Sequence, residues 1–351
     1  MDHGSRHPRM VALDMTYEET SWRRIRRRLV TIPGYFLATV FVTVTVPIWV
    51  PLAAILSLFP GLRGCLRCGL FLTGYLWCEC IGIGISFFVW IRHGLYRGAP
   101  SRAKTFLQAN FRLQCWWAGS LERLGSRIFG VGFEVSGGEA LNGPAVIVIP
   151  RHASIGDTIL PVRLYGQPRD RHLRYVLKRE LLFDPCLDIV GNRLPNFFVD
   201  RFSDDPARER DGVASLLTGL SRSEGVVIYP EGTRFSSAKR EKVLKKLSGD
   251  DRIRAQRWTH LLPPRYGGIL ALLQANPQLD LLFCAHVGLE GSADFFSLIN
   301  GSWVNSTIKV HFWRVPFADI PVDLDGQRNF VVESWDRMQR EVSLLHSARA
   351  G

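Results

Sequence analysis

The chain lacks the features that mark repetitive or disordered proteins. Its 351 residues contain no internal repeat and no low-complexity tract. Apolar residues make up 46% of the sequence and aromatic residues 11%, which excludes a largely disordered chain. The length suffices for one large domain or two modest ones with a sizeable core.

Metal-binding cysteine patterns are also missing. The seven cysteines include Cys65-x-x-Cys68 and Cys78-x-Cys80, but neither pair has a matching second pair of Cys or His in a polar segment. A zinc site is therefore not expected. An odd number of cysteines, four of them in or beside the most apolar segment, is more typical of buried free thiols in a reducing compartment.

Acidic residues are in deficit. The 32 Asp and Glu face 44 Lys and Arg, which gives a formal net charge of +12. A protein this basic is expected to meet anionic partners: nucleic acid, phosphate-bearing substrates or an anionic membrane surface. The basic residues cluster beside apolar segments and no nucleic-acid-binding motif is present, so nucleic acid is not expected as a partner.

Charge is almost absent from two stretches near the N-terminus. Residues 29–59 carry no charged side chain, and residues 68–91 carry only Glu79. About 20 apolar residues cross the ~30 Å hydrocarbon core of a bilayer, so each run is long enough to span it. A cleaved signal peptide fits poorly, because the first run is long, contains prolines and is followed by a second run of the same kind.

The two runs can be arranged in a membrane in two ways. Five arginines between Arg23 and Arg28, and further basic residues after residue 91, favour a cytoplasmic position for both ends. Two complete spans would leave Arg63 and Arg67 on the opposite side. A hairpin inserted into one leaflet avoids that conflict, and its internal prolines suit it. Both arrangements stay open, and both place the rest of the chain at the cytoplasmic face.

The whole chain is expected to divide into four segments. Residues 1–28 are a polar and basic tail, residues 29–100 the membrane hairpin, and residues 101–130 an amphipathic linker helix. Tandem Trp116 and Trp117 beside cations suit a helix at the lipid headgroups, although a helix that packs on the following domain is the equal alternative. Residues 131–351 are expected to form one domain.

Short apolar runs alternate with helical patterns through this last part. Strands are expected at 133–135, 146–149, 175–177, 196–199, 226–229, 281–285 and 308–313, and helices at 206–221, 266–274 and 328–346. The pattern predicts an α/β fold with a mixed sheet flanked by helices, preceded by the N-terminal hydrophobic helical hairpin. The basic segment 239–257 is expected to be a solvated face or loop.

The first candidate for chemistry follows the strand at 146–149. Pro150 stops this strand, and His152 and Asp157 come next, before an apolar run that can open a helix. Open α/β sheets bind ligands at the ends of their strands. A histidine with a nearby carboxylate is the minimal general base with its orienting group, although this spacing alone is common by chance.

Three further motifs occur at predicted strand ends. Phe197-Phe-Val-Asp-Arg201 ends a strand in an Asp-Arg pair, and Val226-Val-Ile-Tyr-Pro-Glu-Gly-Thr-Arg234 continues a strand into a Glu-Gly-Thr-Arg turn. Leu261-Leu-Pro-Pro-Arg265 opens a helix. The guanidinium groups of Arg201 and Arg234 match the geometry of a phosphate. Gly232 would allow the backbone to approach a ligand closely.

In this order the motifs resemble those of the glycerolipid acyltransferase family, which includes the lysophosphatidic acid acyltransferases. The likeness covers about residues 101–320. His152, Ser154 and Asp157 match the first motif, Phe197–Arg201 the second and Glu231–Arg234 the third. Leu262-Pro-Pro-Arg265 is similar to the Leu-Pro-Arg form of the fourth. Arg151 stands where many members have Asn, and Pro195 where many have Gly.

The resemblance implies a glycerol-phosphate-acyltransferase-like fold and a reaction. A fatty acyl group would pass from a thioester, acyl-CoA or acyl-carrier protein, to the free hydroxyl of a lysophospholipid. His152 would take the hydroxyl proton and Asp157 would hold its ring, with no covalent intermediate, metal or other cofactor. Ser154 is expected to make a local backbone hydrogen bond. The implied substrate contacts are Lys178, Arg201, Glu231, Gly232, Thr233, Arg234, Pro263 and Arg265.

The resemblance leaves the acceptor open. The expected one is 1-acylglycerol-3-phosphate, which would give phosphatidic acid. Alternatives are lysophosphatidylglycerol, lysophosphatidylinositol, monolysocardiolipin or glycerol-3-phosphate, and transacylation from a phospholipid donor. A non-catalytic lipid-binding scaffold is a further alternative, supported only by Arg151 and Pro195. The hairpin would dock the protein on the membrane, and the arginines from Arg23 to Arg28 would bind anionic lipids.

Overall fold

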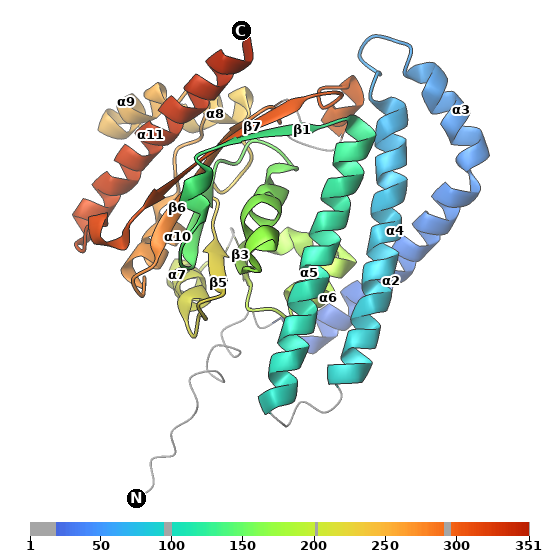
Figure 1. Cartoon of the computed structure of the whole chain (residues 1–351), viewed down its shortest axis with the longest axis horizontal. Coiled ribbons are helices and arrows are strands. Elements are labelled where there is room, and N and C mark those ends of the chain that lie inside the picture. The colour runs from blue at the N-terminus through green and yellow to red at the C-terminus, as the bar shows by residue number, and fades with distance from the viewer. Residues whose placement is uncertain (1–18, 95–99, 201–202, 291–295, 351) are drawn as a thin grey trace, which may run out of the picture.

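The computed structural model describes residues 19–94, 100–200, 203–290 and 296–350. Apolar N-terminal helices lie on one side of the molecule and a helix-flanked sheet on the other (Figure 1). The N-terminal part comprises α2 (Ser21–Val44), α3 (Val46–Leu56), α4 (Cys65–Val89) and the π-helical turn η1 (Trp90–Gly94). Helix α5 (Pro100–Phe129) runs beside α4 and leads into the sheet.

Helices α2 and α4 have the length and composition of membrane-crossing segments. The two candidate spans are Ser21–Val44 and Cys65–His93, of which only 11% and 33% respectively are buried within the protein. A core helix of a soluble protein would be mostly buried. Their large apolar side chains face outward instead, as in Val40 and Phe41 with 59% and 68% exposure. These helices therefore indicate membrane association.

The hairpin is attached to the sheet domain at both ends. Arg27 and Arg28 of α2 form ion pairs with Asp188 at 2.8 and 2.9 Å. At the opposite end, the amide of Gly64 donates to the carbonyl of Ile299. The expectation that all arginines from Arg23 to Arg28 face lipid is thus wrong for two of them, because a buried carboxylate of the domain binds these two guanidinium groups.

A seven-stranded sheet forms the centre of the domain, with the order β1-β7-β6-β2-β5-β3-β4. All neighbouring strands run parallel except β6 and β7, so the sheet is mixed. The strands are β1 (Gly132–Ser136), β2 (Val146–Pro150), β3 (His172–Lys178), β4 (Phe197–Val199), β5 (Glu224–Val227), β6 (Asp280–Val287) and β7 (Thr307–Val315).

Helices cover both faces of this sheet (Figure 1). Besides α5, the helices of the domain are α6 (Pro185–Gly191), α7 (Pro206–Ala214), α8 (Ser237–Leu244), α9 (Gly249–Arg257), α10 (Tyr266–Gln274) and α11 (Leu324–Ala350). Alternate residues of β2 enter separate cores: Ile147 and Ile149 pack toward α10 and α11, while Val146 and Val148 pack toward α5. Burial on both faces explains why the central strands are continuous apolar runs.

The structure confirms the predicted α/β architecture and all seven strands. It corrects four local expectations. The helix expected at 206–221 ends at Ala214, and the basic segment 239–257 is helical in α8 and α9. The apolar run after Asp157 forms short 3₁₀ and π turns, η3 (Asp157–Ile159) and η4 (Pro161–Gly166), in place of a regular helix. The basic segment before residue 29 belongs to α2, which begins at Ser21.

Candidate active site

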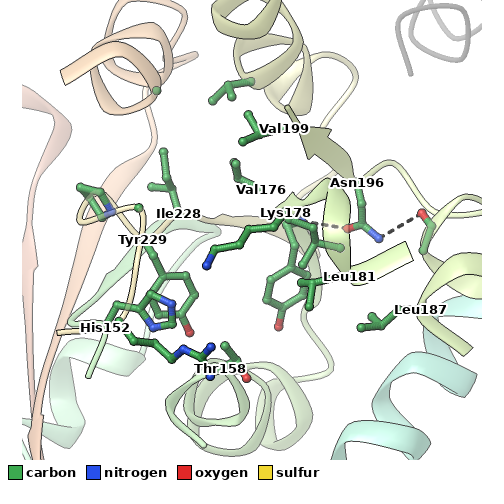
Figure 2. Close-up of a pocket in the computed structure, with 18 of the residues that line it drawn as sticks. His152, Thr158, Val176, Lys178, Leu181, Leu187, Asn196, Val199, Ile228 and Tyr229 are labelled. Atoms are coloured by element: carbon green, nitrogen blue, oxygen red, sulfur yellow. Dashed lines mark hydrogen bonds between the residues drawn. The ribbon is translucent and has the colours of Figure 1, made fainter. Parts of the chain in front are cut away.

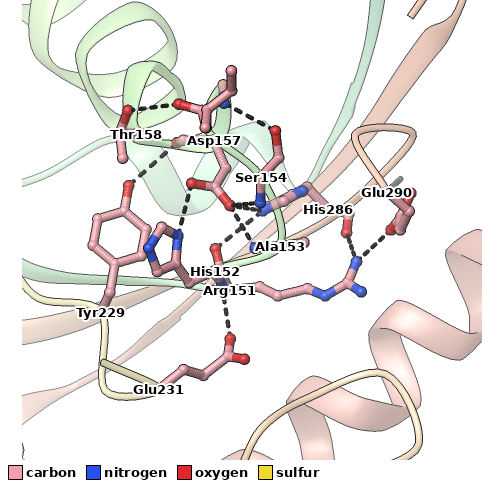
Figure 3. Close-up of polar contacts among 12 residues, drawn as sticks. Arg151, His152, Ala153, Ser154, Asp157, Thr158, Tyr229, Glu231, His286 and Glu290 are labelled. Atoms are coloured by element: carbon pink, nitrogen blue, oxygen red, sulfur yellow. Dashed lines mark hydrogen bonds and ion pairs between the residues drawn. The ribbon is translucent and has the colours of Figure 1, made fainter. Parts of the chain in front are cut away.

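The turn after β2 brings a histidine and a carboxylate together. His152 Nδ1 lies 3.0 Å from Asp157 Oδ1 (Figure 3). A carboxylate can only accept a hydrogen bond, so Nδ1 carries the ring proton and Nε2 keeps its lone pair. His152 lines a cavity, which gives this second nitrogen access to a substrate. The predicted pair is therefore assembled, and its part in catalysis stays a prediction.

Asp157 is completely buried and held by backbone amides. Its Oδ2 accepts hydrogen bonds from the amides of Ala153 and Ser154 at 2.5 and 2.8 Å. Burial alone would raise the pKa of this carboxyl, but His152, His286 and the Ser154 amide outweigh it and hold the pKa below its ordinary value. Asp157 is thus ionised at neutral pH and can stabilise a protonated imidazole.

Ser154 has the local role predicted for it. Its Oγ accepts a hydrogen bond from the amide of Gly156 at 2.9 Å, two residues along the turn. This bond is the short-range side-chain to backbone contact that serine commonly makes in turns. It helps to shape the turn between His152 and Asp157.

Tyr229 and His286 also lie next to the His152–Asp157 pair, and neither was predicted from the sequence. The ring of Tyr229, just after β5, lies 4.6 Å from the ring of His152, and its hydroxyl donates to the carbonyl of Asp157 at 3.2 Å. His286 of β6 is fully buried, and its Nε2 lies 3.0 Å from the carbonyl oxygen of Arg151 and 3.7 Å from Asp157 Oδ2. A lone histidine inside an otherwise apolar strand was the available signal.

Arg151 departs from the motif of the family that the sequence resembles, and it is fully buried directly before His152. Its fully buried guanidinium donates to the carbonyls of His286 and His260 and pairs with Glu290 at 2.5 Å. Burial would raise the pKa of Glu290, but Arg151 lowers it to about 2. Arg151 therefore joins the ends of β2 and β6, and its presence leaves the His152–Asp157 contact intact.

Glu231 is placed differently from the substrate contact that the resemblance implied. Its side chain is 2% exposed, and its two oxygens accept hydrogen bonds from the amides of His152 and Leu262 at 2.7 and 3.0 Å. Burial raises the pKa of the carboxyl to about 8, against the lowering influence of the two amides. Glu231 thus connects the turn of the first motif to the segment of the fourth.

The other predicted substrate contacts divide by their position around the cavity, whose volume is about 610 Å³. Lys178, Gly232, Arg234 and Arg265 line it together with His152. Figure 2 shows the Lys178 ammonium directed toward Tyr229 and His152. Gly232 has φ +67°, which only glycine adopts readily. Within the described part of the chain, Glu231, Thr233 and Pro263 are not among the lining residues, and Arg201 lies outside the described residues.

Beyond this basic region the cavity becomes apolar. Its walls there come from α5, from η3 and η4, and from the segment around η6 (Arg179–Phe183) and α6; they include Trp117, Ile155, Val162, Leu181 and Leu187. Figure 2 shows Leu181 and Leu187 on the side of the cavity away from His152. A volume of this size and a mostly apolar lining with a few convergent polar groups are typical of a small-molecule site.

Comparisons with known proteins show what the sequence and the fold are similar to. Residues 132–277 match the family model described as Acyltransferase. The fold is similar to the crystal structure of the 1-acyl-sn-glycerophosphate (LPA) acyltransferase PlsC from Thermotoga maritima, with a TM-score of 0.51 and 17% sequence identity. The match covers 81% of this chain and 98% of that chain. No curated protein matches the sequence significantly. Residues 132–277 are therefore similar to the acyltransferase family, and the chain has a PlsC-like fold.

Proposed function

We propose that this protein is a membrane-bound acyltransferase that moves a fatty acyl group from acyl-CoA, or from acyl-carrier protein, to the free hydroxyl of a lysophospholipid. The preferred acceptor under this proposal is 1-acylglycerol-3-phosphate, which would yield phosphatidic acid. The observation that carries the proposal is the His152–Asp157 pair at the edge of a cavity with basic groups near it and an apolar region beyond.

His152 acts as the general base in this mechanism. Nε2 takes the proton of the acceptor hydroxyl, and the hydroxyl oxygen attacks the carbonyl carbon of the thioester. Asp157 stabilises the imidazolium that results, through the hydrogen bond at Nδ1. The carbon–sulfur bond then breaks, and the departing thiolate takes the proton from His152. The thioester is already activated, so no acyl-enzyme is needed.

The basic lining residues bind the phosphate of the acceptor. Arg234 and Arg265 line the cavity, and neither guanidinium has a carboxylate partner among the described residues. Such a group can form short, charge-assisted hydrogen bonds with phosphate oxygens. Lys178 lies closer to His152 and adds positive charge where the reacting groups meet. Arg201 is retained as a further predicted phosphate contact.

The N-terminal helices keep the cavity at the bilayer, where both lipid substrates reside. The exposed apolar side chains of α2, α3 and α4 enter the membrane, and the exposed Arg23 and Arg26 contact anionic lipids on the cytoplasmic side. The contacts of Gly64 and of Arg27 with the domain at the two ends of the hairpin favour insertion into one leaflet over a complete span. Asp188 holds its N-terminal end against the domain that carries the cavity.

An acceptor panel tests the proposal. Full-length protein in liposomes receives oleoyl-CoA and a set of lysophospholipids, and mass spectrometry identifies the products. Product from 1-acylglycerol-3-phosphate above all other acceptors supports the preferred function. A larger lysophospholipid as the best acceptor would make the protein a remodelling enzyme. Absence of product with every acceptor, and with both CoA and carrier-protein donors, would contradict the proposal.

A further inference from the structure

The apolar part of the cavity contains two polar atoms that the proposed mechanism does not use. Tyr175 in β3 and Gln114 in α5 both line the cavity. The hydroxyl of Tyr175 and the Oε1 of Gln114 are buried, and neither has a hydrogen-bond partner in the described part of the chain. Tyr175 is 8% exposed as a whole residue. A buried polar atom without a partner is unfavourable and rare in native proteins.

The neighbours of these two atoms cannot satisfy them. Trp117, the other hydrogen-bonding side chain of α5 at this cavity, already donates its indole N–H to Glu79. Val190 and Cys186 of α6 line the same part of the cavity and offer no strong donor or acceptor. The hydrogen-bond partner of Tyr175 and Gln114 is therefore water or a ligand that occupies the cavity.

The two atoms are complementary and belong to residues that line the same cavity. A phenol hydroxyl donates readily, whereas an amide oxygen only accepts. Tyr175 packs in the same apolar core as Ala118 of α5, and both residues line the cavity. Gln114 lies one helical turn before Ala118 on the same face of α5, so Gln114 and Tyr175 border the same part of the cavity. A hydroxyl group meets both requirements, because it accepts from Tyr175 and donates to Gln114. An ester or thioester carbonyl would leave Gln114 unsatisfied.

We propose that this part of the cavity selects a fatty acyl chain that bears a hydroxyl group, with Tyr175 and Gln114 as the specificity-determining residues. The inference rests on the proposed function, which makes an acyl chain the occupant. The hydroxylated chain can belong to the acyl thioester or to the lysophospholipid, and the chemistry of recognition is the same for both.

Direct binding tests the selection without turnover. Isothermal titration calorimetry on the full-length protein in detergent compares palmitic acid with hydroxypalmitic acids that differ in hydroxyl position. At least one isomer should bind about 3–10-fold more tightly than palmitic acid, the ratio expected for one or two buried hydrogen bonds. The inference is overturned if every isomer binds with the same or lower affinity.

Matched variants assign the preference to the two side chains. Tyr175→Phe and Gln114→Leu each keep the volume and remove one hydrogen-bonding atom, so each should reduce the preference while palmitic acid binds as before. Tyr165→Phe is the control, because Tyr165 is a buried tyrosine that does not line the cavity. A preference that survives both cavity variants would contradict the assignment. The affinities of palmitic and hydroxypalmitic acids for the wild-type protein test the inference even if a variant does not fold.

Turnover separates this inference from the proposed function and identifies the hydroxylated substrate. One arm gives unsubstituted and hydroxylated palmitoyl-CoA with the same lysophospholipid, and the other gives unsubstituted and hydroxylated lysophospholipids with palmitoyl-CoA. Tyr175→Phe should remove the preference for the hydroxylated substrate in one arm, and that arm shows whether the hydroxylated chain belongs to the thioester or to the lysophospholipid. Turnover of unsubstituted substrates with no preference in either arm overturns only the inference. Lack of all turnover contradicts the proposed function and leaves the binding result standing.

Discussion

Two regions of the candidate site differ in whether their polar groups have hydrogen-bond partners. At the ends of β2 and β5, Asp157 and Glu231 each accept two or more hydrogen bonds from neighbouring groups. In the cavity, Tyr175 and Arg234 present polar groups without partners among the described residues. The first region is organised before any substrate arrives. The second is completed only when a ligand supplies the missing partners.

The two buried carboxyls sharpen this comparison. Asp157 is buried beside two histidine rings and has a lowered pKa, whereas burial outweighs the amides and Arg151 near Glu231 and raises its pKa to about 8. The histidines outweigh burial at Asp157 and favour the ionised carboxyl, whereas burial has the larger influence at Glu231 and favours the neutral form. Asp157 is therefore suited to chemistry and Glu231 to positioning, although both follow strand ends in the sequence.

The largest effect is expected from Asp157→Asn. The substitution keeps the shape of the side chain and removes the charge that stabilises the imidazolium, so kcat should fall about 10²–10⁴-fold with little change in KM. Steady-state kinetics of acyl transfer in liposomes would measure it. Asp170→Asn is the control, because the side chain of Asp170 is 99% exposed. A kcat within threefold of wild type would show that Asp157 does not support the base.

Arg234→Ala tests the region whose polar groups are expected to find their partners in a ligand. Loss of one charge-assisted hydrogen bond to phosphate should raise KM for 1-acylglycerol-3-phosphate about 10–100-fold, with a smaller change in kcat. Monoacylglycerol, which lacks the phosphate, serves as the control acceptor, and its KM should not change. An unchanged KM for every phosphate-bearing acceptor would remove Arg234 from the phosphate site.

Glu231→Gln tests the region in which Asp157 and Glu231 already have hydrogen-bond partners, and its expected effect on activity is smaller. An amide group in place of one carboxylate oxygen would face the N–H of His152 or Leu262, so one buried hydrogen bond is lost. We expect about 1–3 kcal/mol lower free energy of unfolding and a lower kcat with unchanged KM. Denaturant unfolding in detergent and steady-state kinetics would measure the two effects. A raised KM with unchanged stability would restore Glu231 to the role of a substrate contact.

The ion pair of Arg151 and Glu290 predicts a dependence of stability on pH. The folded pKa of Glu290, about 2, lies below the ordinary value of 4.5. Its contribution is therefore complete above about pH 4.5 and is lost as the pH falls toward 2, by at most about 1.4 kcal/mol per pH unit. Melting temperatures of wild type and Glu290→Gln should differ at pH 7 and converge as the pH is lowered. A difference that does not vary with pH would contradict this assignment.

The fold was predictable because its signals are local. Residues 146–149 and 281–285 are apolar at every position, and burial on both faces of a central strand requires that pattern. The helical nature of residues 239–257 was missed, since α8 and α9 bury little apolar surface and so carry no clear apolar periodicity. The pairing of Arg27 with Asp188 joins residues 161 positions apart, which no local pattern reveals.

The candidate site was predictable in part for the same reason. The contact of His152 with Asp157 spans five residues and follows from one turn. The direction of the Glu231 side chain depends on where the segment around Leu262 lies, and the buried position of Arg151 depends on the end of β6. Tyr175 sits in a predicted strand, but only the cavity beside that strand shows that its hydroxyl is unpartnered.

The most direct test of the account is the rate of acyl transfer by wild type and His152→Ala in liposomes with oleoyl-CoA and 1-acylglycerol-3-phosphate. We expect wild type to form phosphatidic acid, and the variant to be at least about 100-fold slower while it stays bound to the liposomes. Transfer by the variant at the wild-type rate would contradict the assignment of His152 as the base.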